Sequence, residues 1–109
     1  MKRYYLALDL IDDEALIKQY ELWHTNGWPE IKKSILDSGI INMEIYRTGN
    51  RLFMALEVED DFDFVNKAKM DKANPKVQEW EELMSRFQQP LPWAAKNEKW
   101  VLMERIFEL

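Results

Sequence analysis

Hydrophobic and polar residues alternate close to the N-terminus of the chain. Over residues 3–10, Tyr4, Leu6, Leu8 and Leu10 share one face of an extended segment, while the residues between them occupy the other face. Successive side chains of a strand point to opposite faces of its sheet, so this period of two predicts a half-buried strand.

The spacing of apolar residues then changes to that of a helix. Asp12 and Asp13 provide an N-cap and acidic side chains that suit the positive end of a helix dipole, and the helix is predicted to continue to about Asn26. Pro29 interrupts it and can begin a second, short helix that runs to Asp37. The inward face of the first helix is expected to comprise Leu16, Ile17, Tyr20, Trp23 and His24.

Alternation returns in the next two segments. Residues 40–47 and 51–59 each carry apolar residues at every second position, and Thr48-Gly49-Asn50 between them is typical of a turn. The two segments therefore predict a β-hairpin. The apolar positions are Ile41, Met43 and Ile45 in the first segment and Leu52, Met54, Leu56 and Val58 in the second.

A helical pattern is repeated in the second half of the chain. We expect one helix over residues 61–72 and another from Pro75 to about Phe87. Residues 88–97 are expected to form a long loop, and residues 99–107 to form the last strand. The inward positions expected on the first of these helices are Phe62, Val65 and Ala68.

The predicted order of elements is β-α-β-β-α-β. This order is typical of an α+β, ferredoxin-like fold, in which an antiparallel four-stranded sheet carries helices on one face. The other face would hold the large side chains of Tyr5, Tyr46, Phe53, Trp100 and Ile106. Such a face is too apolar to leave in water, so we expect it to be buried against a second copy in a two-fold homodimer.

Composition and charge narrow the class of protein. The 109 residues are 47% hydrophobic and 32% charged, which fits a single folded domain over residues 1–109. A net charge of −5 without a basic stripe argues against binding to nucleic acid or to an anionic membrane surface. The lack of cysteine excludes disulfides, thiolate zinc sites and a cysteine nucleophile. We see neither a signal peptide nor an apolar run of about 18 residues, so a cytoplasmic location is expected.

The only histidine of the chain, His24, lies in an aromatic run. Tyr20, His24 and Trp28 are four positions apart, so on a helix they lie on roughly one face. Imidazole has an unperturbed pKa of about 6.5 and can give or take a proton at neutral pH. A lone histidine is often only a surface or packing residue. Here the aligned rings, and the helix break at Gly27 and Pro29, make a catalytic role an equal alternative.

Trp80 and Glu81 form a second candidate site. An indole beside a carboxylate can bind a sugar, because the ring stacks on C–H faces and the oxygens accept hydroxyl hydrogens. A core tryptophan beside a solvated glutamate would explain the same pair. The acidic pairs Asp60-Asp61 and Glu81-Glu82 are interpreted as helix-start and surface charge, so no metal is expected. Phosphate-loop and nucleophile-elbow motifs are absent, and no cofactor is indicated.

Several of these segments, taken together, resemble one known family, the L-rhamnose mutarotases. The segments that carry the resemblance are Tyr20-x3-His24-x3-Trp28-Pro29-Glu30, Ile45-Tyr46, Leu52-Phe53, Trp80 and the terminal Glu104-Arg105-Ile106-Phe107-Glu108-Leu109. The resemblance covers nearly the whole chain. It implies a ferredoxin-like fold of the dimeric α/β-barrel type, a homodimer, and the interconversion of α and β anomers of a deoxy-sugar without cofactor or metal.

The resemblance also implies tasks for individual residues. His24 matches the proton donor of the family, and Tyr20 matches a substrate-binding tyrosine. Trp80 matches the first of two consecutive tryptophans that hold the sugar, whereas Glu81 replaces the second and Met43 replaces another tyrosine. Both replacements alter polarity, and a carboxylate at position 81 can accept from a differently placed hydroxyl, as an L-fucose mutarotase would need. The residues expected to bind the substrate are Tyr20, Trp28, Met43, Trp80 and Glu81.

Two other functions fit the same sequence. Small dimeric ferredoxin-like proteins include cofactor-free monooxygenases with tryptophan- and histidine-lined pockets, and oxygen uptake with a quinol substrate would identify one. A non-catalytic small-molecule-binding or dimerisation module would use the rings only as core. Sugar would then change the tryptophan fluorescence without accelerating any reaction.

Overall fold

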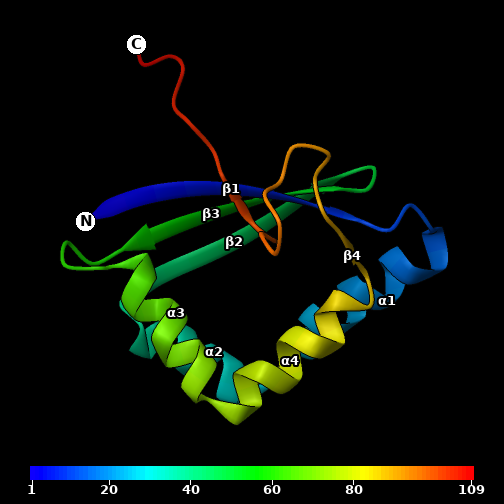
Figure 1. Cartoon of the computed structure of the whole chain (residues 1–109), viewed down its shortest axis with the longest axis horizontal. Coiled ribbons are helices and arrows are strands. Elements are labelled where there is room, and N and C mark those ends of the chain that lie inside the picture. The colour runs from blue at the N-terminus through cyan, green and yellow to red at the C-terminus, as the bar shows by residue number, and fades with distance from the viewer.

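A layer of helices packs against one face of an antiparallel sheet (Figure 1). The computed structural model describes all 109 residues. Its elements are β1 (Lys2–Leu10), α1 (Glu14–Thr25), α2 (Pro29–Asp37), β2 (Ile40–Thr48), β3 (Arg51–Val58), α3 (Phe64–Ala73), α4 (Pro75–Ser85), β4 (Gln88–Gln89) and β5 (Val101–Leu102). None of the helices is both long enough and apolar enough to cross a bilayer.

The sheet has the strand order β2-β3-β1-β4, and β5 also pairs with β1. All neighbouring strands are antiparallel. The two short strands pair with different parts of β1: β4 lies opposite Asp9 and Leu10, and β5 lies opposite Leu6 and Ala7. Together they occupy the fourth strand position of a ferredoxin-like sheet, which confirms the predicted fold class.

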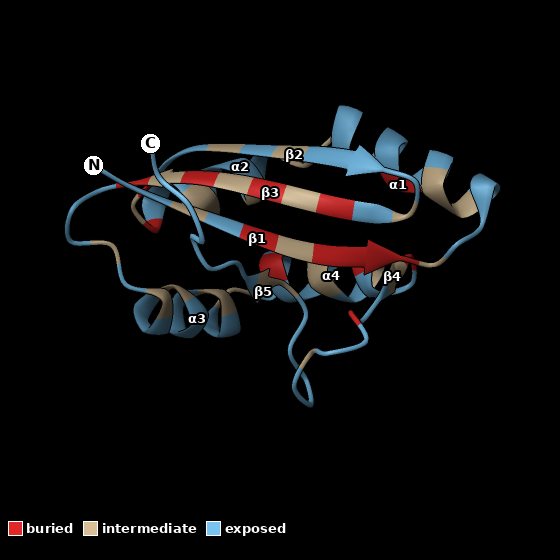
Figure 2. Cartoon of the chain, turned by 90° about the horizontal axis from the view of Figure 1, so that it is seen from above, coloured by how far each residue is buried: buried red, intermediate tan, exposed pale blue.

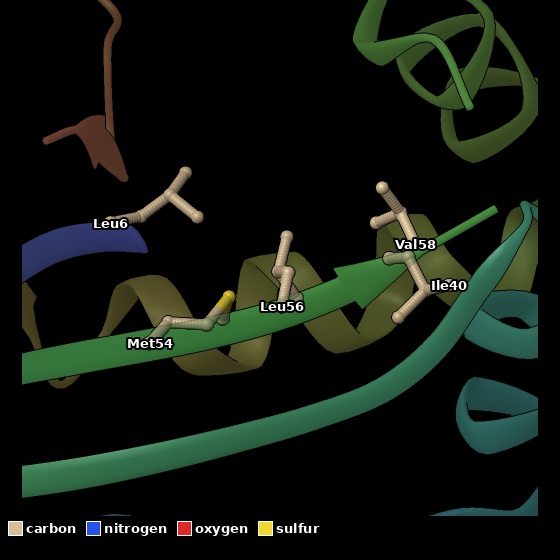
Figure 3. Packing of buried hydrophobic residues seen from close by; sticks show 5 residues of the cluster. All are labelled: Leu6, Ile40, Met54, Leu56 and Val58. Atoms are coloured by element: carbon tan, nitrogen blue, oxygen red, sulfur yellow. The ribbon is translucent and has the colours of Figure 1, made fainter. Parts of the chain in front are cut away.

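The alternation in β1 and β3 separates two faces of the sheet. On β3, every second residue is buried, and the residues between them are less buried (Figure 2). The buried residues pack against side chains of the helices. One buried cluster comprises Leu6, Ile40, Met54, Leu56 and Val58 (Figure 3). A second cluster comprises Leu10, Tyr20, Leu52, Met84 and Phe87. Burial of each aliphatic side chain of this size stabilises the fold by about 1.5–3 kcal/mol.

The start of β2 differs from the prediction. The sequence placed Ile41 on the apolar face with Met43 and Ile45, but Ile41 is 43% exposed and Ile40 is 1% exposed. A register shift between Ile40 and Asn42 on the pairing with β3 explains the exchange. An extra residue at a bulge reverses which side chains face the core on that side of it.

Helix α3 begins later than expected, because Asp63 caps it by accepting a hydrogen bond from the Val65 main chain. Val65 is 63% exposed and Ala68 is also exposed, so their predicted inward positions were wrong. Phe62 and Phe64 instead pack against the first buried cluster, where the Phe64 ring lies 4.9 Å from that of Tyr4. The contact of α3 with the core is thus made mainly at its N-terminal end.

The last strand is much shorter than the predicted 99–107. Only Val101 and Leu102 form β5, and Leu102 lies opposite Leu6, whose side chain faces the helices. Two residues before Leu102, Trp100 shares this orientation and packs against both buried clusters. Its predicted place on the open sheet face was therefore wrong. Ile106, also expected on that face, is 95% exposed beyond the end of the strand.

Candidate functional site

The end of α1 and the start of α2 position the predicted histidine and its neighbours. Helix α1 is fixed at its start by Asp13, whose side chain accepts from the Leu16 main chain at 3.0 Å. Its last residue is Thr25, which Asn26 follows as the C-cap, and α2 begins at Pro29, which provides the fixed φ that suits the first turn. Trp28 is the residue between the two helices that caps α2 with an extended backbone. A short break in the helix therefore places an indole just beyond His24.

The His24 imidazole is held by its own helix. Its Nδ1 lies 2.8 Å from the main-chain oxygen of Tyr20, one turn earlier. A carbonyl oxygen can only accept, so Nδ1 carries the hydrogen. Nε2 is then the nitrogen that remains for another molecule, as an acceptor when the ring is neutral and as a donor when it is protonated. His24 is also exposed, so solvent and solutes can reach it.

The His24 ring belongs to a cluster with three other aromatic rings, which come from α1, from α4 and from the segment between α1 and α2. Its ring centroid lies 4.4 Å from that of Tyr20 on α1 and 5.5 Å from that of Trp80 on α4. The Trp28 and Trp80 rings contact each other edge to face, with centroids 5.1 Å apart. The Lys76 ammonium lies over the Trp28 ring, 5.1 Å from its centroid. Residues that are more than fifty positions apart in the sequence thus form one cluster.

A cavity of about 550 Å³ lies between these helices and the sheet. Its volume falls within the range of small-molecule sites, about 300–1,000 Å³. All the residues predicted from the sequence line it: Tyr20, His24, Trp28, Met43, Trp80 and Glu81. A second hollow, of about 790 Å³, opens along α1, α2 and β2 and shares Tyr20, His24 and Met43 with the first. His24 therefore lies where the two spaces adjoin.

Tyr20 is the most deeply buried member of this set, at 4% exposed. Burial raises the pKa of its phenol above the ordinary value of 10.0, although a hydrogen bond from the side chain of Gln88 acts in the opposite direction. Tyr20 therefore stays protonated throughout the neutral range. In a reaction at neutral pH it can donate or accept a hydrogen bond, but it does not act as an anionic base.

Among the site residues predicted from the sequence, Glu81 is the only one that brings a negative charge to the cavity wall. It is half-buried, and its carboxylate forms an ion pair with no cationic side chain of the chain. The nearby Lys99 ammonium donates instead to the Glu81 main-chain oxygen, at 3.4 Å. The carboxylate oxygens of Glu81 thus remain available as acceptors. Met43, on β2, supplies an apolar side chain that forms no such bond.

Sequence reasoning missed several residues of the cavity wall. Trp100 and Lys99 line it, and both were assigned to a regular strand. Gln88 was assigned to a loop, and no spacing in the sequence marks it. The ion pair between Lys67 and Asp71 on α3 also lines the cavity. Of these missed residues, only this pair has a recognisable signal in the sequence, which is the i, i+4 spacing of opposite charges on a helix. The structure brings no three metal-binding side chains together.

The chain resembles proteins of known function in its sequence and in its fold. An L-fucose mutarotase of Xanthomonas campestris pv. campestris is 48% identical over 111 residues, which cover 100% of this chain and 89% of that protein. The structure of an L-rhamnose mutarotase from Formosa agariphila has a TM-score of 0.73 at 22% identity and covers 100% of this chain and 99% of that chain.

A second solved structure extends the likeness in fold alone. Tetracenomycin F2 cyclase from Streptomyces glaucescens, a type-II polyketide cyclase, has a TM-score of 0.69 at 15% identity, with 100% of this chain and 97% of that chain covered. The fold by itself therefore does not identify the reaction. Residues 3–109 match the L-rhamnose mutarotase family. The chain accordingly belongs to the L-rhamnose mutarotases, a family of isomerases.

Proposed function

We propose that this protein interconverts the α and β anomers of a 6-deoxy-hexose in the 550 Å³ cavity, with His24 as the general acid and base. The observation that carries the proposal is the state of the imidazole. Its Nδ1 is fixed on the Tyr20 carbonyl, so Nε2 is left for the substrate in a cavity that also holds Trp80 and Glu81. An imidazole, an indole and a carboxylate thus line the same cavity, which supports the proposal.

Anomer exchange requires two proton transfers. The C1–O5 bond of the hemiacetal breaks as the ring oxygen gains a proton and the anomeric hydroxyl loses one, which gives the open-chain aldehyde. After rotation about the C1–C2 bond, the C5 hydroxyl adds to the other face of the carbonyl and both transfers are reversed. Each step of this kind is typically accelerated about 10²–10⁴-fold by a positioned acid or base.

In this scheme, protonated His24 gives its Nε2 hydrogen to the ring oxygen and recovers it on ring closure. Glu81 takes the proton of the anomeric hydroxyl as the ring opens and returns it to the carbonyl oxygen as the ring closes, and Tyr20 orients a sugar oxygen. Trp28, Trp80 and Met43 supply the apolar wall that limits competition from bulk water. No redox step occurs, because the aldehyde of the intermediate is the masked carbonyl of the sugar itself.

We further propose that L-fucose is a better substrate than L-rhamnose. Support comes from Glu81 and Met43, which change the polarity of two positions in the wall, and from the L-fucose mutarotase that is 48% identical. A free carboxylate at position 81 can accept a hydrogen bond from a sugar hydroxyl, which an indole cannot do. One good hydrogen bond to a charged group corresponds to about 1.5–3 kcal/mol, or roughly a tenfold to hundredfold difference in rate between two sugars.

Exchange NMR on a panel of 6-deoxy sugars tests both parts of this proposal. We expect acceleration of anomer exchange above the spontaneous rate, larger for L-fucose than for L-rhamnose. Glu81→Gln keeps the size of the side chain but removes its charge, and should reduce the L-fucose rate more than the L-rhamnose rate. A clear preference of the native protein for L-rhamnose would refute the substrate assignment, and a lack of acceleration with every sugar would refute the activity.

The open face of the sheet supports a homodimer, which we propose as the functional form. Tyr5 and Phe53 stack on this face, with ring centroids 5.6 Å apart and an angle of 14° between the rings. Tyr46 continues the patch at 6.1 Å from Phe53 and is 54% exposed. Salt bridges of Arg3 with Glu57 and of Arg51 with Asp9 border the rings. An apolar centre with a polar rim is the pattern of an interface core.

A further inference from the structure

Gln88 is a polar residue of the cavity wall that the proposed mechanism does not use. It lies on β4, opposite Leu10 of β1, and is half-buried. Its Nε2 donates to the phenol oxygen of Tyr20 at 3.5 Å. Its Oε1 is the only buried side-chain nitrogen or oxygen of the chain without a hydrogen-bond partner.

An orphaned carbonyl oxygen is unfavourable for stability. A buried acceptor that has left water without finding a donor carries a desolvation penalty, and most native structures contain few such atoms. A methionine or leucine at position 88 would fill similar space without that penalty. Stability therefore does not explain an amide at position 88. Its single hydrogen-bond partner, Tyr20, indicates a functional explanation.

The amide nitrogen decides where the phenol proton of Tyr20 points. A phenol has one hydrogen to donate, and the amide nitrogen of Gln88 is a donor that cannot accept it. When Gln88 donates to the Tyr20 oxygen, the phenol hydrogen must turn to a different acceptor. Tyr20 is 4% exposed and lines the cavity, so an oxygen of a bound molecule is the acceptor that remains.

We propose that Gln88 is a positioning residue that makes Tyr20 a hydrogen-bond donor towards an oxygen of the bound sugar. The inference rests on the proposed mutarotase activity and deepens it. With a hydrogen-bond acceptor in place of the Gln88 amide nitrogen, Tyr20 would direct its proton at residue 88. It would then offer the sugar only a lone pair.

Two substitutions separate this role from simple packing. Gln88→Met keeps the length of the side chain but removes the donor, and Gln88→Glu places a carboxylate that accepts a hydrogen bond from the Tyr20 phenol at neutral pH. We expect kcat/KM for anomer exchange, measured by NMR with L-fucose, to fall about tenfold in the first and at least as much in the second. Gln89→Met, on the exposed neighbouring position of β4, is the matched control and should retain the native rate.

Two further readouts distinguish positioning from structural damage. Urea unfolding should show Gln88→Met to be at least as stable as the native protein, because the orphaned oxygen is removed with the amide. Titration of tyrosine absorbance, with Tyr20→Phe subtracted, should show a higher pKa for Tyr20 in Gln88→Met, since the N–H that favours the phenolate is lost. A packing defect would instead lower stability and leave activity per folded molecule unchanged.

The outcomes are distinct for the two proposals. If the native protein accelerates anomer exchange but both Gln88 variants match its kcat/KM, the role of Gln88 is refuted and the proposed function stands. If the native protein accelerates no sugar, the proposed function itself fails. Should Gln88→Met not fold, the penalty argument is wrong, and Gln88→Glu alone then decides whether the donor matters.

Discussion

The two faces of the sheet are made by the same strands but hold different chemistry. On the covered face, β1 and β3 contribute a wall of aliphatic side chains, and the helices add His24, Tyr20 and Trp80 above it. On the open face, the same strands present Tyr5 and Phe53 between salt bridges. The period of two along a strand is enough to generate both surfaces.

The difference between the faces lies in how the polar groups are used. On the open face, Asp9 is buried under a bidentate contact with Arg51, at 2.8 and 3.1 Å, and Trp93 lies over the same guanidinium at 5.2 Å. Those charges are already paired within the chain. On the covered face, the Glu81 carboxylate and the His24 Nε2 are left without partners from the protein. Unpaired polar groups in a cavity favour the binding of a ligand. Charges that are already paired around exposed aromatic rings favour contact with the surface of another protein.

The largest expected effect is the loss of catalysis when His24, on the covered face, is replaced. His24→Asn retains an N–H that can donate to the Tyr20 carbonyl, but it cannot exchange a proton at neutral pH. We expect the enzymatic acceleration of anomer exchange to fall about 10²–10⁴-fold, measured by NMR, with association of subunits unchanged.

Leu22→Asn is the control for this substitution. Leu22 lies on the same helix, is 60% exposed and lines neither hollow, so the introduced asparagine should leave the rate as it is. Full activity of His24→Asn would remove the histidine from the mechanism and would end the functional contrast between the faces.

A smaller effect is expected when the open face is altered. Phe53→Asp places a charge at the centre of the ring patch, and desolvation of that charge should weaken self-association by about 2 kcal/mol or more, roughly 30-fold in the dimer dissociation constant. Sedimentation equilibrium measures this change.

Val65→Asp serves as the control here, because Val65 is equally apolar but is exposed on α3, away from the sheet. Its dissociation constant should match that of the native protein. If Phe53→Asp associates as tightly as the native chain, the open face is not the interface.

The smallest expected effect concerns the pH dependence of stability on the covered face. Burial raises the pKa of Tyr20 above 10.0, so the folded protein keeps a proton that an unfolded chain loses. The stabilisation is therefore fully present below pH 10.0 and is lost as the pH rises through the folded-state pKa. Urea unfolding between about pH 9 and about pH 11 should show a steeper loss for the native protein than for Tyr20→Phe. Parallel pH profiles would indicate that the phenol is not protected by burial.

The alternation of apolar and polar residues predicted the strands well where one face of the sheet is buried and the other is not. Leu52, Met54, Leu56 and Val58 were all placed correctly on the covered face, because an apolar residue at every second position has one physical interpretation in a half-buried strand. The order of elements then followed from the turns and proline breaks. The family resemblance gave the candidate residues, and the structure brings all of them to the wall of one cavity.

The errors arose where orientation depends on a partner strand. Ile40 and Ile41 are chemically the same residue, and only the bulge against β3 decides which of them is buried. Trp100 follows the same logic, since its face is set by the register of Leu102 opposite Leu6. Neither register is encoded in the local sequence, because it results from long-range pairing.

The sequence by itself determined the three long strands and the four helices, and it supplied a histidine four positions after a tyrosine and a tryptophan four positions after the histidine. Local periodicity and chain breaks act over a few residues, so they can be read without knowledge of the fold. Only the tertiary structure decided that Trp80 meets His24 and that Gln88 donates to Tyr20. Both contacts join residues distant in sequence, and they exist because β1, α1 and α4 pack around one core.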